Sequence, residues 1–161
     1  METEKKYKLT DEYRTIRCIK LYRIEALKDF GAVHKGDKGG FIGSEVNLSH
    51  NGDCWVCGNA RVWGNARVYG NARVCGDARV YGNAEVCGDA EVVNNADYIV
   101  FKNWWSSGRY FTWTRSNNMW RVGCFYGTGE ELIAKAYRDS ELSCKEYERV
   151  VKYVESILKE D

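Results

Sequence analysis

The sequence predicts a mainly β protein organised around a short parallel β-helix, for two reasons. A six-residue unit recurs eight times without an insertion from Gly52 to Ile99. Six of these units read Gly-Asn/Asp-Ala-Arg/Glu-Val-x, which places a valine near a corner where glycine tolerates a positive φ angle. A six-residue period fits neither a helix nor a long flat strand, so we expect short strands separated by a turn in every unit.

Three segments are expected to form three structural parts. Residues 1–51 form a polar tail and an N-terminal β cap, residues 52–99 the β-helix, and residues 100–161 a C-terminal α+β module with many aromatic and basic residues. A cap is needed because the open end of a β-helix exposes unpaired backbone groups and core valines.

The N-terminal segment combines a polar start with an apolar run and a glycine-rich bridge. Residues 1–12 are expected to be a tail. From Tyr13 to Leu27 apolar and polar residues nearly alternate, which favours one or two strands, although the spacing of the isoleucines also suits a helix face. The glycines from Gly31 to Gly43 then predict turns leading to the first repeat.

The repeat is similar to the left-handed hexapeptide family, in which an aliphatic residue is followed four places later by a small one. Valine and alanine take these places here, from Val56 and Ala60 onwards, although the glycine that usually follows the aliphatic residue lies one place later. The resemblance implies a left-handed β-helix of about three coils. It also implies three units per coil, so that residues 18 apart stack at about the 4.8 Å spacing of strands.

Charged residues give this register a check. The stacked pairs are Arg67 with Glu85, Arg73 with Glu91, and Arg61 with Arg79, with Asp97 beyond the last pair. Two of the three columns are complementary, which supports the register but contributes only about 0 to 1 kcal/mol for each exposed pair.

Aromatic residues occupy the variable last position of several units. In the 18-residue register Trp63 stacks with Tyr81, and Tyr69 lies over Cys87. Exposed rungs of a sheet would explain them, but aromatic residues and arginines on a rigid face are also what subunit interfaces select. We therefore expect Trp63, Tyr69 and Tyr81 to form an interface in a homo-oligomer, and the family resemblance implies a trimer.

After Ile99 the period ends, and the composition predicts three strands followed by two helices. The strands are expected at residues 98–102, 109–114 and 119–125, separated by turns at Ser106–Gly108 and Ser116–Asn118. Thr128 with Glu131 and Ser143 with Glu146 fit the capping-box pattern that opens a helix. An apolar stripe in the second helix then predicts helices packed on one face of a three-stranded sheet.

The C-terminal module also carries the candidate ligand site. Aromatic side chains interleaved with cations on an open sheet can stack on bases and hold phosphates, as nucleotide and single-strand binders do. Burial in the core is the competing explanation for the aromatic residues, and helix capping for Thr128. The candidate ligand-binding residues are Lys102, Trp104, Trp105, Ser106, Ser107, Arg109, Tyr110, Thr112, Arg121 and Thr128.

Composition excludes several broad classes of function. The 24 basic and 23 acidic residues give a net charge of +1, so a general polyanion-binding surface is not indicated. No apolar run approaches the length of a membrane span, and Met1 to Lys8 lack the apolar centre of a signal peptide, so we expect a cytoplasmic protein. The seven cysteines are expected to be reduced fillers of small half-buried positions, with no metal site and no cofactor.

Catalytic constellations are scarce. The hexapeptide-repeat family is dominated by acyltransferases, and the resemblance implies that such an enzyme would need a histidine base on a coil or inserted loop. The repeat contains no histidine, and His34 and His50 both lie before it. We assign no catalytic residue, and an acyltransferase that uses His50 is the alternative to a binding protein.

Several motifs resemble a group of proteins encoded by phages and prophages of gut bacteria. They are Tyr22–Leu27, Gly36–Ile42, Asn47–His50, the Gly-Asn-Ala-Arg-Val-Tyr units, and the tail segments Phe101–Tyr110 and Tyr126–Leu132. The resemblance covers most of residues 20–99 and implies a phage-type accessory protein in the host cytoplasm. Together with the chemistry of the C-terminal module and the missing catalytic set, this leads us to expect non-enzymatic capture of a nucleotide or nucleic acid to blunt host defence. A structural prism that binds a host defence protein is a further alternative.

Overall fold

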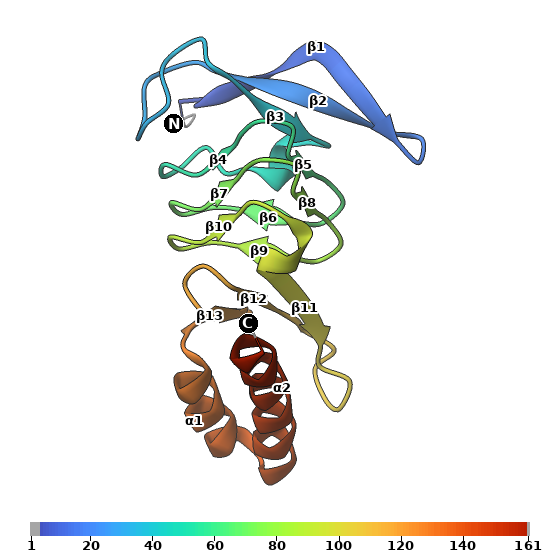
Figure 1. The fold of residues 1–161 in the computed structure, drawn as a ribbon, viewed down its shortest axis with the longest axis vertical. Helices are drawn as coiled ribbons and strands as arrows, with labels where there is room; N and C mark the ends of the chain where they lie inside the picture. Colours follow the sequence, from blue (N-terminus) through green and yellow to red (C-terminus); the bar gives the residue numbers. More distant parts are fainter. Residues whose placement is uncertain (1–3, 161) are drawn as a thin grey trace.

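The computed structural model describes residues 4–160, which form an elongated molecule (Figure 1). The N-terminal strands lie at one end, the repeats in the middle and the two helices at the other end, in the order of the sequence. In the described part of the chain, no helix is both long and apolar enough to cross a membrane.

The repeats form a parallel β-helix of very short strands. These are β4 (Trp55–Val56), β5 (Arg61–Val62), β6 (Arg67–Val68), β7 (Arg73–Val74), β8 (Arg79–Val80), β9 (Glu85–Val86) and β10 (Glu91–Val92). Val74 pairs with Val56 on one side and with Val92 on the other, so strands 18 residues apart are neighbours. The pairs β5–β8 and β6–β9 repeat this spacing, which confirms the predicted register.

The valines and alanines of the repeat fill the interior. Every valine from Val56 to Val92 on these strands is at most 1% exposed, and the alanines from Ala60 to Ala90 are fully buried. The corner glycines from Gly58 to Gly88 have φ angles between +62° and +69°, as their position in the repeat predicts. Each coil therefore adds a layer of small aliphatic side chains to the core, and the chain turns at the glycines between its strands.

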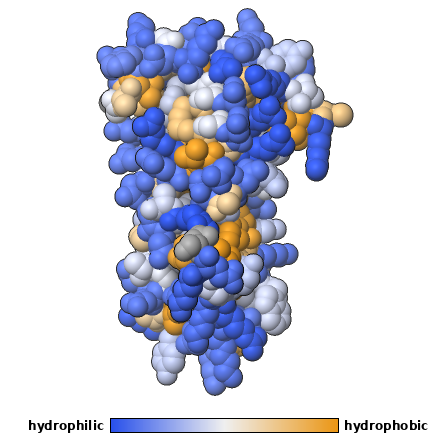
Figure 2. Space-filling view, in the orientation of Figure 1, coloured by the Kyte–Doolittle hydropathy of each residue, from blue (hydrophilic) through white to orange (hydrophobic). Residues whose placement is uncertain are grey.

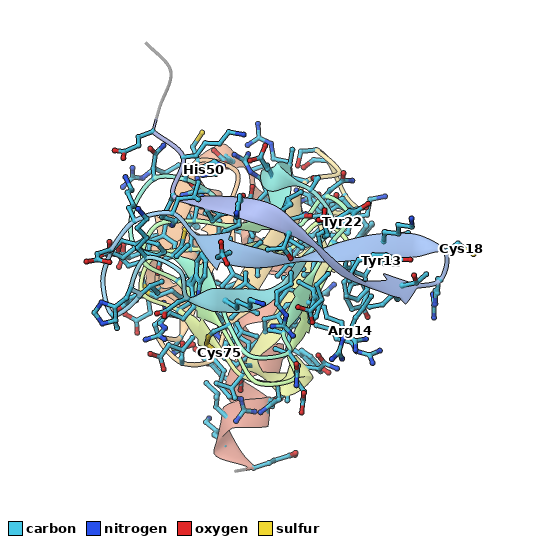
Figure 3. The ribbon with its side chains drawn as sticks, turned by 90° about the horizontal axis from the view of Figure 1, so that it is seen from above. Tyr13, Arg14, Cys18, Tyr22, His50 and Cys75 are labelled. Carbon is cyan, nitrogen blue, oxygen red and sulfur yellow. A yellow bond between two sulfur atoms is a disulfide. The ribbon has the colours of Figure 1, made fainter. Side chains whose placement is uncertain are left out.

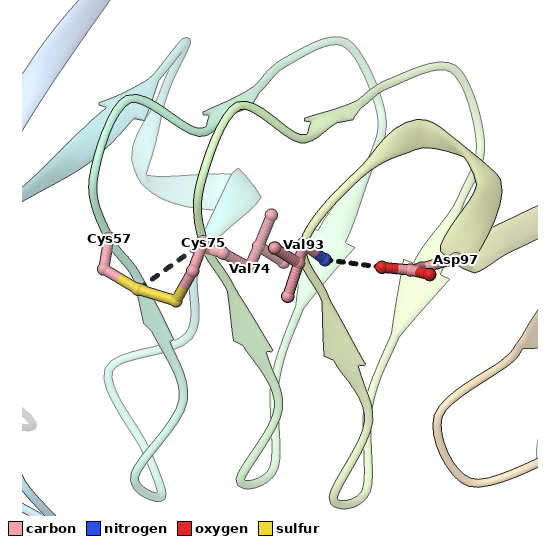
Figure 4. The surroundings of a disulfide bond; sticks show 5 residues. All are labelled: Cys57, Val74, Cys75, Val93 and Asp97. Atoms are coloured by element: carbon pink, nitrogen blue, oxygen red, sulfur yellow. Dashed lines mark hydrogen bonds between the residues drawn. A yellow bond between two sulfur atoms is a disulfide. The ribbon is translucent and has the colours of Figure 1, made fainter.

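One column of the stack contains a disulfide bond. Cys57 and Cys75 occupy the same place in consecutive coils, with Cα atoms 4.6 Å apart, and their sulfur atoms are bonded (Figure 4). The next residue in this column is Val93, whose backbone N–H donates to the Asp97 carboxylate. The prediction that all cysteines are reduced was therefore wrong for this pair, because the 18-residue register brings the two thiols together.

The charge columns follow the predicted pairs only in part. Arg67 pairs with Glu85 and Arg73 with Glu91, and Arg61 lies beside Arg79, as expected. Asp97 does not extend the last column, because its Oδ2 accepts hydrogen bonds from the backbone N–H groups of Val93 and Asn94, at 2.8 and 3.1 Å. Its side chain completes the capping box of the short 3₁₀ turn η2 (Asn95–Asp97), whose N-cap residue is Asn94.

Three N-terminal strands cover one end of the β-helix. β1 (Tyr7–Ile16), β2 (Ile19–Ala26) and β3 (Lys38–Ile42) form an antiparallel sheet, and β3 then pairs in parallel with β5. The second short 3₁₀ turn, η1 (Glu45–Asn47), leads into the repeats. This corrects the expected tail for residues 7–12, since β1 begins at the fully buried Tyr7, while residues 1–3 of that expected tail lie outside the described part of the chain.

The β1–β2 hairpin extends beyond the body of the molecule. Its two-residue turn, Arg17 and Cys18, has positive φ angles of 46° and 71°, as tight hairpin turns require. Figure 3 shows the hairpin lying across the top of the molecule, with Cys18 at the projecting tip and His50 near the opposite end. On the face shown in Figure 2 most of the surface is hydrophilic, and apolar residues form separate small patches.

The C-terminal module has four strands rather than the expected three. The sheet order is β11 (Tyr98–Lys102), β12 (Tyr110–Thr114), β13 (Met119–Val122) and β14 (Phe125–Gly127), all antiparallel. The glycine at position 123, with a φ of +53°, turns the chain back and divides the expected third strand in two. The strand β14 thus pairs with β13 instead of continuing it.

Two helices cover the apolar face of this sheet. They are α1 (Gly129–Asp139) and α2 (Glu141–Lys159), which pack on Phe111, Trp113 and Trp120. Thr128 accepts a hydrogen bond from the Glu131 N–H and caps α1, as predicted. The cap of α2 is Ser140 rather than Ser143, since the Ser140 hydroxyl accepts from the Ser143 N–H at 3.0 Å.

Candidate binding groove

The polar face of the C-terminal sheet closes the second end of the β-helix. Within the β-helix, the backbone N–H of each strand donates to a carbonyl of the next coil, as Arg67 does to Ala84 at 3.0 Å. No next coil follows the last three strands. Their N–H groups donate instead to side-chain oxygens: Arg79 to Asn95 Oδ1, Glu85 to Thr112 Oγ1 and Glu91 to Ser116 Oγ, at 2.8 to 3.0 Å. These three side chains thus supply the acceptors that a further coil would have provided for the backbone N–H groups.

This closure occupies two of the predicted ligand-binding residues. Thr112 is 2% exposed and holds the Glu85 N–H, while the Arg121 guanidinium lies 3.6 Å from the Glu85 carboxylate. Arg121 also lies over the Tyr69 ring, 5.4 Å from its centroid. The sheet face expected to hold a ligand therefore holds the end of the β-helix.

Other predicted residues stabilise the C-terminal module itself. The half-buried Trp105 donates from its indole Nε1 to Ser143 Oγ at 3.1 Å and packs edge-on against Tyr147. Ser106 donates its backbone N–H to the Asn103 side chain, and Ser107 Oγ accepts from the Arg109 N–H. Thr128 is the cap of α1.

Seven predicted residues remain exposed, and they are spread over β11, β12, the loop between these strands and the start of α1: Lys102, Trp104, Ser106, Ser107, Arg109, Tyr110 and Thr128. Trp104 is 70% exposed and Tyr110 is 41% exposed, and Lys102 is the exposed end of β11. Lys102 and Tyr110 are direct partners across β11 and β12. Thr128 lines a hollow of about 220 Å³ beside the two helices, and Tyr110 lines a larger one.

That hollow lies between the β-helix and strand β11. It has a volume of about 450 Å³ and is lined by Tyr81, Gly82, Asn83, Asn95, Tyr98, Ile99, Val100 and Tyr110. A second hollow of about 230 Å³ continues toward the β1–β2 hairpin and is lined by Ile16, Arg17, Ile19, Trp63, Arg79, Tyr81 and Asn95. Because the two share Tyr81 and Asn95, we treat them as one feature, the Tyr81 groove.

An aromatic stack runs into this groove. The Trp63 and Tyr81 rings are parallel within 10°, with centroids 4.8 Å apart, and Tyr81 is still 52% exposed. The structure thus brings together two of the three residues expected at a subunit interface. Tyr69 lies elsewhere, in the column of Cys87 and beneath Arg121.

Hydrogen bonds hold the wall of the groove. The Tyr98 hydroxyl donates to the Arg79 carbonyl at 2.7 Å, and the Arg79 N–H donates to Asn95 Oδ1 at 3.0 Å. Asn83 accepts at Oδ1 from the Asn65 amide at 3.4 Å. The amide nitrogens of Asn83 and Asn95 are thus hydrogen-bond donors beside the aromatic rings.

The charge of the groove is positive. Among the described residues that line it, the charged ones are Arg17 and Arg79, and neither an aspartate nor a glutamate is included. Planar rings, amide donors and guanidinium groups together suit a flat ligand that carries negative charge. Sequence reasoning missed Asn83, Asn95 and Tyr98. The usable signal was that Asn83 lies two residues after Tyr81, which the 18-residue register stacks on Trp63.

The Tyr98 contact predicts a loss of stability in alkali. Burial raises the pKa of Tyr98 from 10.0 to about 12. Its contribution to stability is complete below pH 10 and is lost as the pH rises toward 12, because the unfolded state then ionises first. In urea titrations across this range we expect the unfolding free energy of Tyr98→Phe to fall less steeply than that of the wild type. Tyr137→Phe, on an exposed ring, is the control, and parallel curves for all three proteins would contradict the prediction.

His50 is engaged in the N-terminal cap. Its Nδ1 accepts the Lys6 backbone N–H at 3.1 Å, its Nε2 lies 3.3 Å from Glu45 Oε1, and its ring stacks on Tyr7 at 4.2 Å. Because the Nδ1 lone pair accepts a backbone hydrogen bond and Nε2–H faces a carboxylate, neither nitrogen is free to take a proton from a substrate. Across residues 4–160, no group of three or more histidine, cysteine or acidic side chains is placed to hold a metal ion.

Comparison with known proteins supports the nature of the repeat. A family model described as the YdcK beta solenoid repeat matches residues 60–76, 66–82 and 72–88. Residues 60–88 thus carry a β-solenoid repeat. The three overlapping matches are offset by six residues and lie within the segment where β5 to β9 stack. No curated protein matches the chain.

Proposed function

We propose that this protein is a non-enzymatic binding protein that takes a nucleotide-class ligand in the Tyr81 groove. The observation that carries the proposal is the Trp63–Tyr81 stack, which ends at the groove. One face of the Tyr81 ring lies against Trp63, so a base entering the larger hollow would continue the stack on the other face.

The polar groups of the groove support the same class of ligand. The amides of Asn83 and Asn95 can donate to base-edge oxygen and ring-nitrogen atoms, and Tyr110 adds a second aromatic surface. Arg79 and Arg17, in the adjoining hollow, supply charge for a phosphate group. The engagement of His50 disfavours the alternative of an acyltransferase that uses this residue as its base.

The biological setting is part of the proposal. The resemblance to phage and prophage proteins supports action in the cytoplasm of an infected host. Sequestering a nucleotide signal there would blunt a defence response. A β-solenoid is suited to this work, because its stacked backbone holds the groove in one shape before the ligand arrives.

Calorimetric titration with a panel of linear and cyclic nucleotides tests the proposal. We expect one or more of them to bind, and Tyr81→Ala to weaken that binding about tenfold or more, because stacking on an aromatic ring contributes about 1–3 kcal/mol per base. Tyr137→Ala, a 75% exposed tyrosine on α1, is the matched control and should leave the affinity unchanged. Absence of binding across the panel, or equal loss in both variants, would refute the proposal.

A second candidate function for the same surface is a homo-oligomer interface, with a trimer as the proposed state. The observation in its favour is that Tyr81, at 52%, and the nearby Ile19, at 45%, are both large and exposed along one groove. Sedimentation velocity of the wild type and of Tyr81→Ala separates the two functions. A wild-type trimer that Tyr81→Ala dissociates would assign the groove to assembly. If the wild type and the variant are both monomers, the groove is free for a ligand.

A further inference from the structure

A buried lysine lies against a buried cysteine where the N-terminal segment meets the β-helix. Lys6 is 1% exposed and Cys54 is fully buried. The Lys6 Nζ donates to the carbonyls of Cys54 and Gly52, at 2.7 and 3.2 Å, and lies 3.3 Å from Cys54 Sγ. In the described chain no carboxylate forms a salt bridge with this amine, and the Phe30 ring covers it at 4.7 Å.

The surroundings favour the neutral forms of both groups. Burial lowers the pKa of Lys6, and burial raises the pKa of Cys54. The thiol lies 3.5 and 3.6 Å from the carbonyls of Ser49 and Asn51, to which its S–H can donate, while its lone pairs face the amine. The Lys6 nitrogen becomes a nucleophile when it gives up a proton, and it lies in contact with the one atom that oxidation would make electrophilic.

We propose that Lys6 and Cys54 form a covalent sulfenamide cross-link when the protein meets a peroxide. In the first step the sulfur attacks a peroxide oxygen, the O–O bond breaks, and the thiol proton leaves with the departing hydroxide as water. In the second step the Lys6 nitrogen attacks the sulfenic sulfur, the S–O bond breaks, and the hydroxyl leaves as water with one amine proton. With hydrogen peroxide, one thiol, one amine and one peroxide thus give one S–N bond and two waters, and the protein loses two hydrogen atoms.

A surface hollow approaches the buried sulfur of Cys54. A hollow of about 460 Å³ on the surface is lined by Ser49, His50 and Asn51, among others. Ser49 and Asn51 are the residues whose carbonyls contact Cys54 Sγ, so this hollow ends one residue layer from the thiol. A molecule of the size of hydrogen peroxide needs only a small opening there.

The cross-link would join two segments that are otherwise held only by non-covalent contacts. Lys6 immediately precedes β1, Cys54 immediately precedes β4, and they are 48 residues apart. The bond would therefore fasten the N-terminal cap to the first coil. Reduction by a thiol would release it, because an exchange thiol attacks the sulfur and returns the amine.

Peptide mapping by mass spectrometry of the full chain, before and after treatment with hydrogen peroxide, tests the proposal. We expect a cross-linked species joining the peptides of Lys6 and Cys54, lighter than their sum by two hydrogen atoms and removed by dithiothreitol. The variant Cys54→Ser should lack it, and Cys87→Ser, which removes another buried cysteine with no lysine in contact, should retain it.

Two results would overturn the proposal. One is recovery of unmodified Cys54 at a peroxide dose that fully oxidises the exposed Cys18 and Cys124. The other is oxidation of Cys54 to the sulfinic acid with Lys6 unmodified. Both are read from the wild-type chain, so the test does not depend on whether a Lys6 variant folds.

Discussion

Replacing Asn47 by alanine is expected to lower the free energy of unfolding by about 3 kcal/mol, because one buried side-chain amide bonds to four backbone groups. Its Oδ1 accepts from the N–H groups of Gly43 and Ser44, at 3.1 and 2.9 Å. Its Nδ2 donates to the carbonyls of Gly64 and Ala66, at 3.1 and 2.8 Å. Asn47 is 1% exposed, so water does not readily replace these bonds when the side chain is removed.

Urea unfolding followed by circular dichroism measures this loss. Asn65→Ala is the matched control, since Asn65 is exposed and its side chain donates a long hydrogen bond to Asn83 Oδ1 at 3.4 Å. We expect a change of less than about 0.5 kcal/mol there. Similar losses in the two variants would mean that Asn47 does not join the cap to the β-helix in the way described.

Gly39→Ala is expected to destabilise the protein by about 3 kcal/mol, through a steric clash rather than lost hydrogen bonds. A methyl group at this position would meet the Val56 carbonyl oxygen, with Ile24 Cγ1 at 2.7 Å and Trp55 Cζ2 at 2.8 Å. All three neighbours are buried, and the carbonyl belongs to the β-helix backbone, so none can move without disturbing the first coil.

Gly43→Ala provides the comparison on the same connection. There the nearest atom to an added methyl group is Asn47 Oδ1 at 3.3 Å, and the expected loss is below about 1 kcal/mol. Thermal melts of the two variants should separate clearly. If Gly39→Ala melts with the wild type, then β3 does not pack directly on β4 and β5.

The repeat could be predicted from the sequence because it is regular. The six-residue spacing of glycine, alanine and valine predicts the strand length, the positions of the corners and the residues of the core. The stacking of three units per coil follows from the family resemblance. The strand β1 could not be predicted in the same way. Residues 8 to 12 are polar except for the half-buried Leu9, and the hydroxyl of the buried Tyr7 donates to the Leu48 carbonyl at 2.7 Å, a contact with no local signal in the sequence.

The C-terminal module shows where alternation of residues stops being informative. Alternation correctly separates an apolar from a polar face, and Phe111, Trp113 and Trp120 do pack on the helices. It does not say what covers the polar face. Thr112 and Ser116 bond the end of a β-helix that is distant in sequence, a pairing with no local signature.

The Tyr81 groove was hidden for a related reason. Its walls come from the β-helix, from η2, from β11 and β12 and from the β1–β2 hairpin, which meet only in the folded molecule. The individual residues Trp63, Tyr81 and Tyr110 were singled out for their chemistry. Their assignment to two separate functions reflected the absence of any sequence signal for the contact between these segments.

The three side-chain oxygens of Asn95, Thr112 and Ser116 have a consequence for how copies of the protein behave together. An uncapped coil presents strand edges in the same register as the coil before it, which is a template for another molecule to add end to end. These side chains accept hydrogen bonds from the last three N–H groups, and the ladder of backbone hydrogen bonds therefore ends within one chain. They act as terminators of a fibre that the repeat by itself would be able to build.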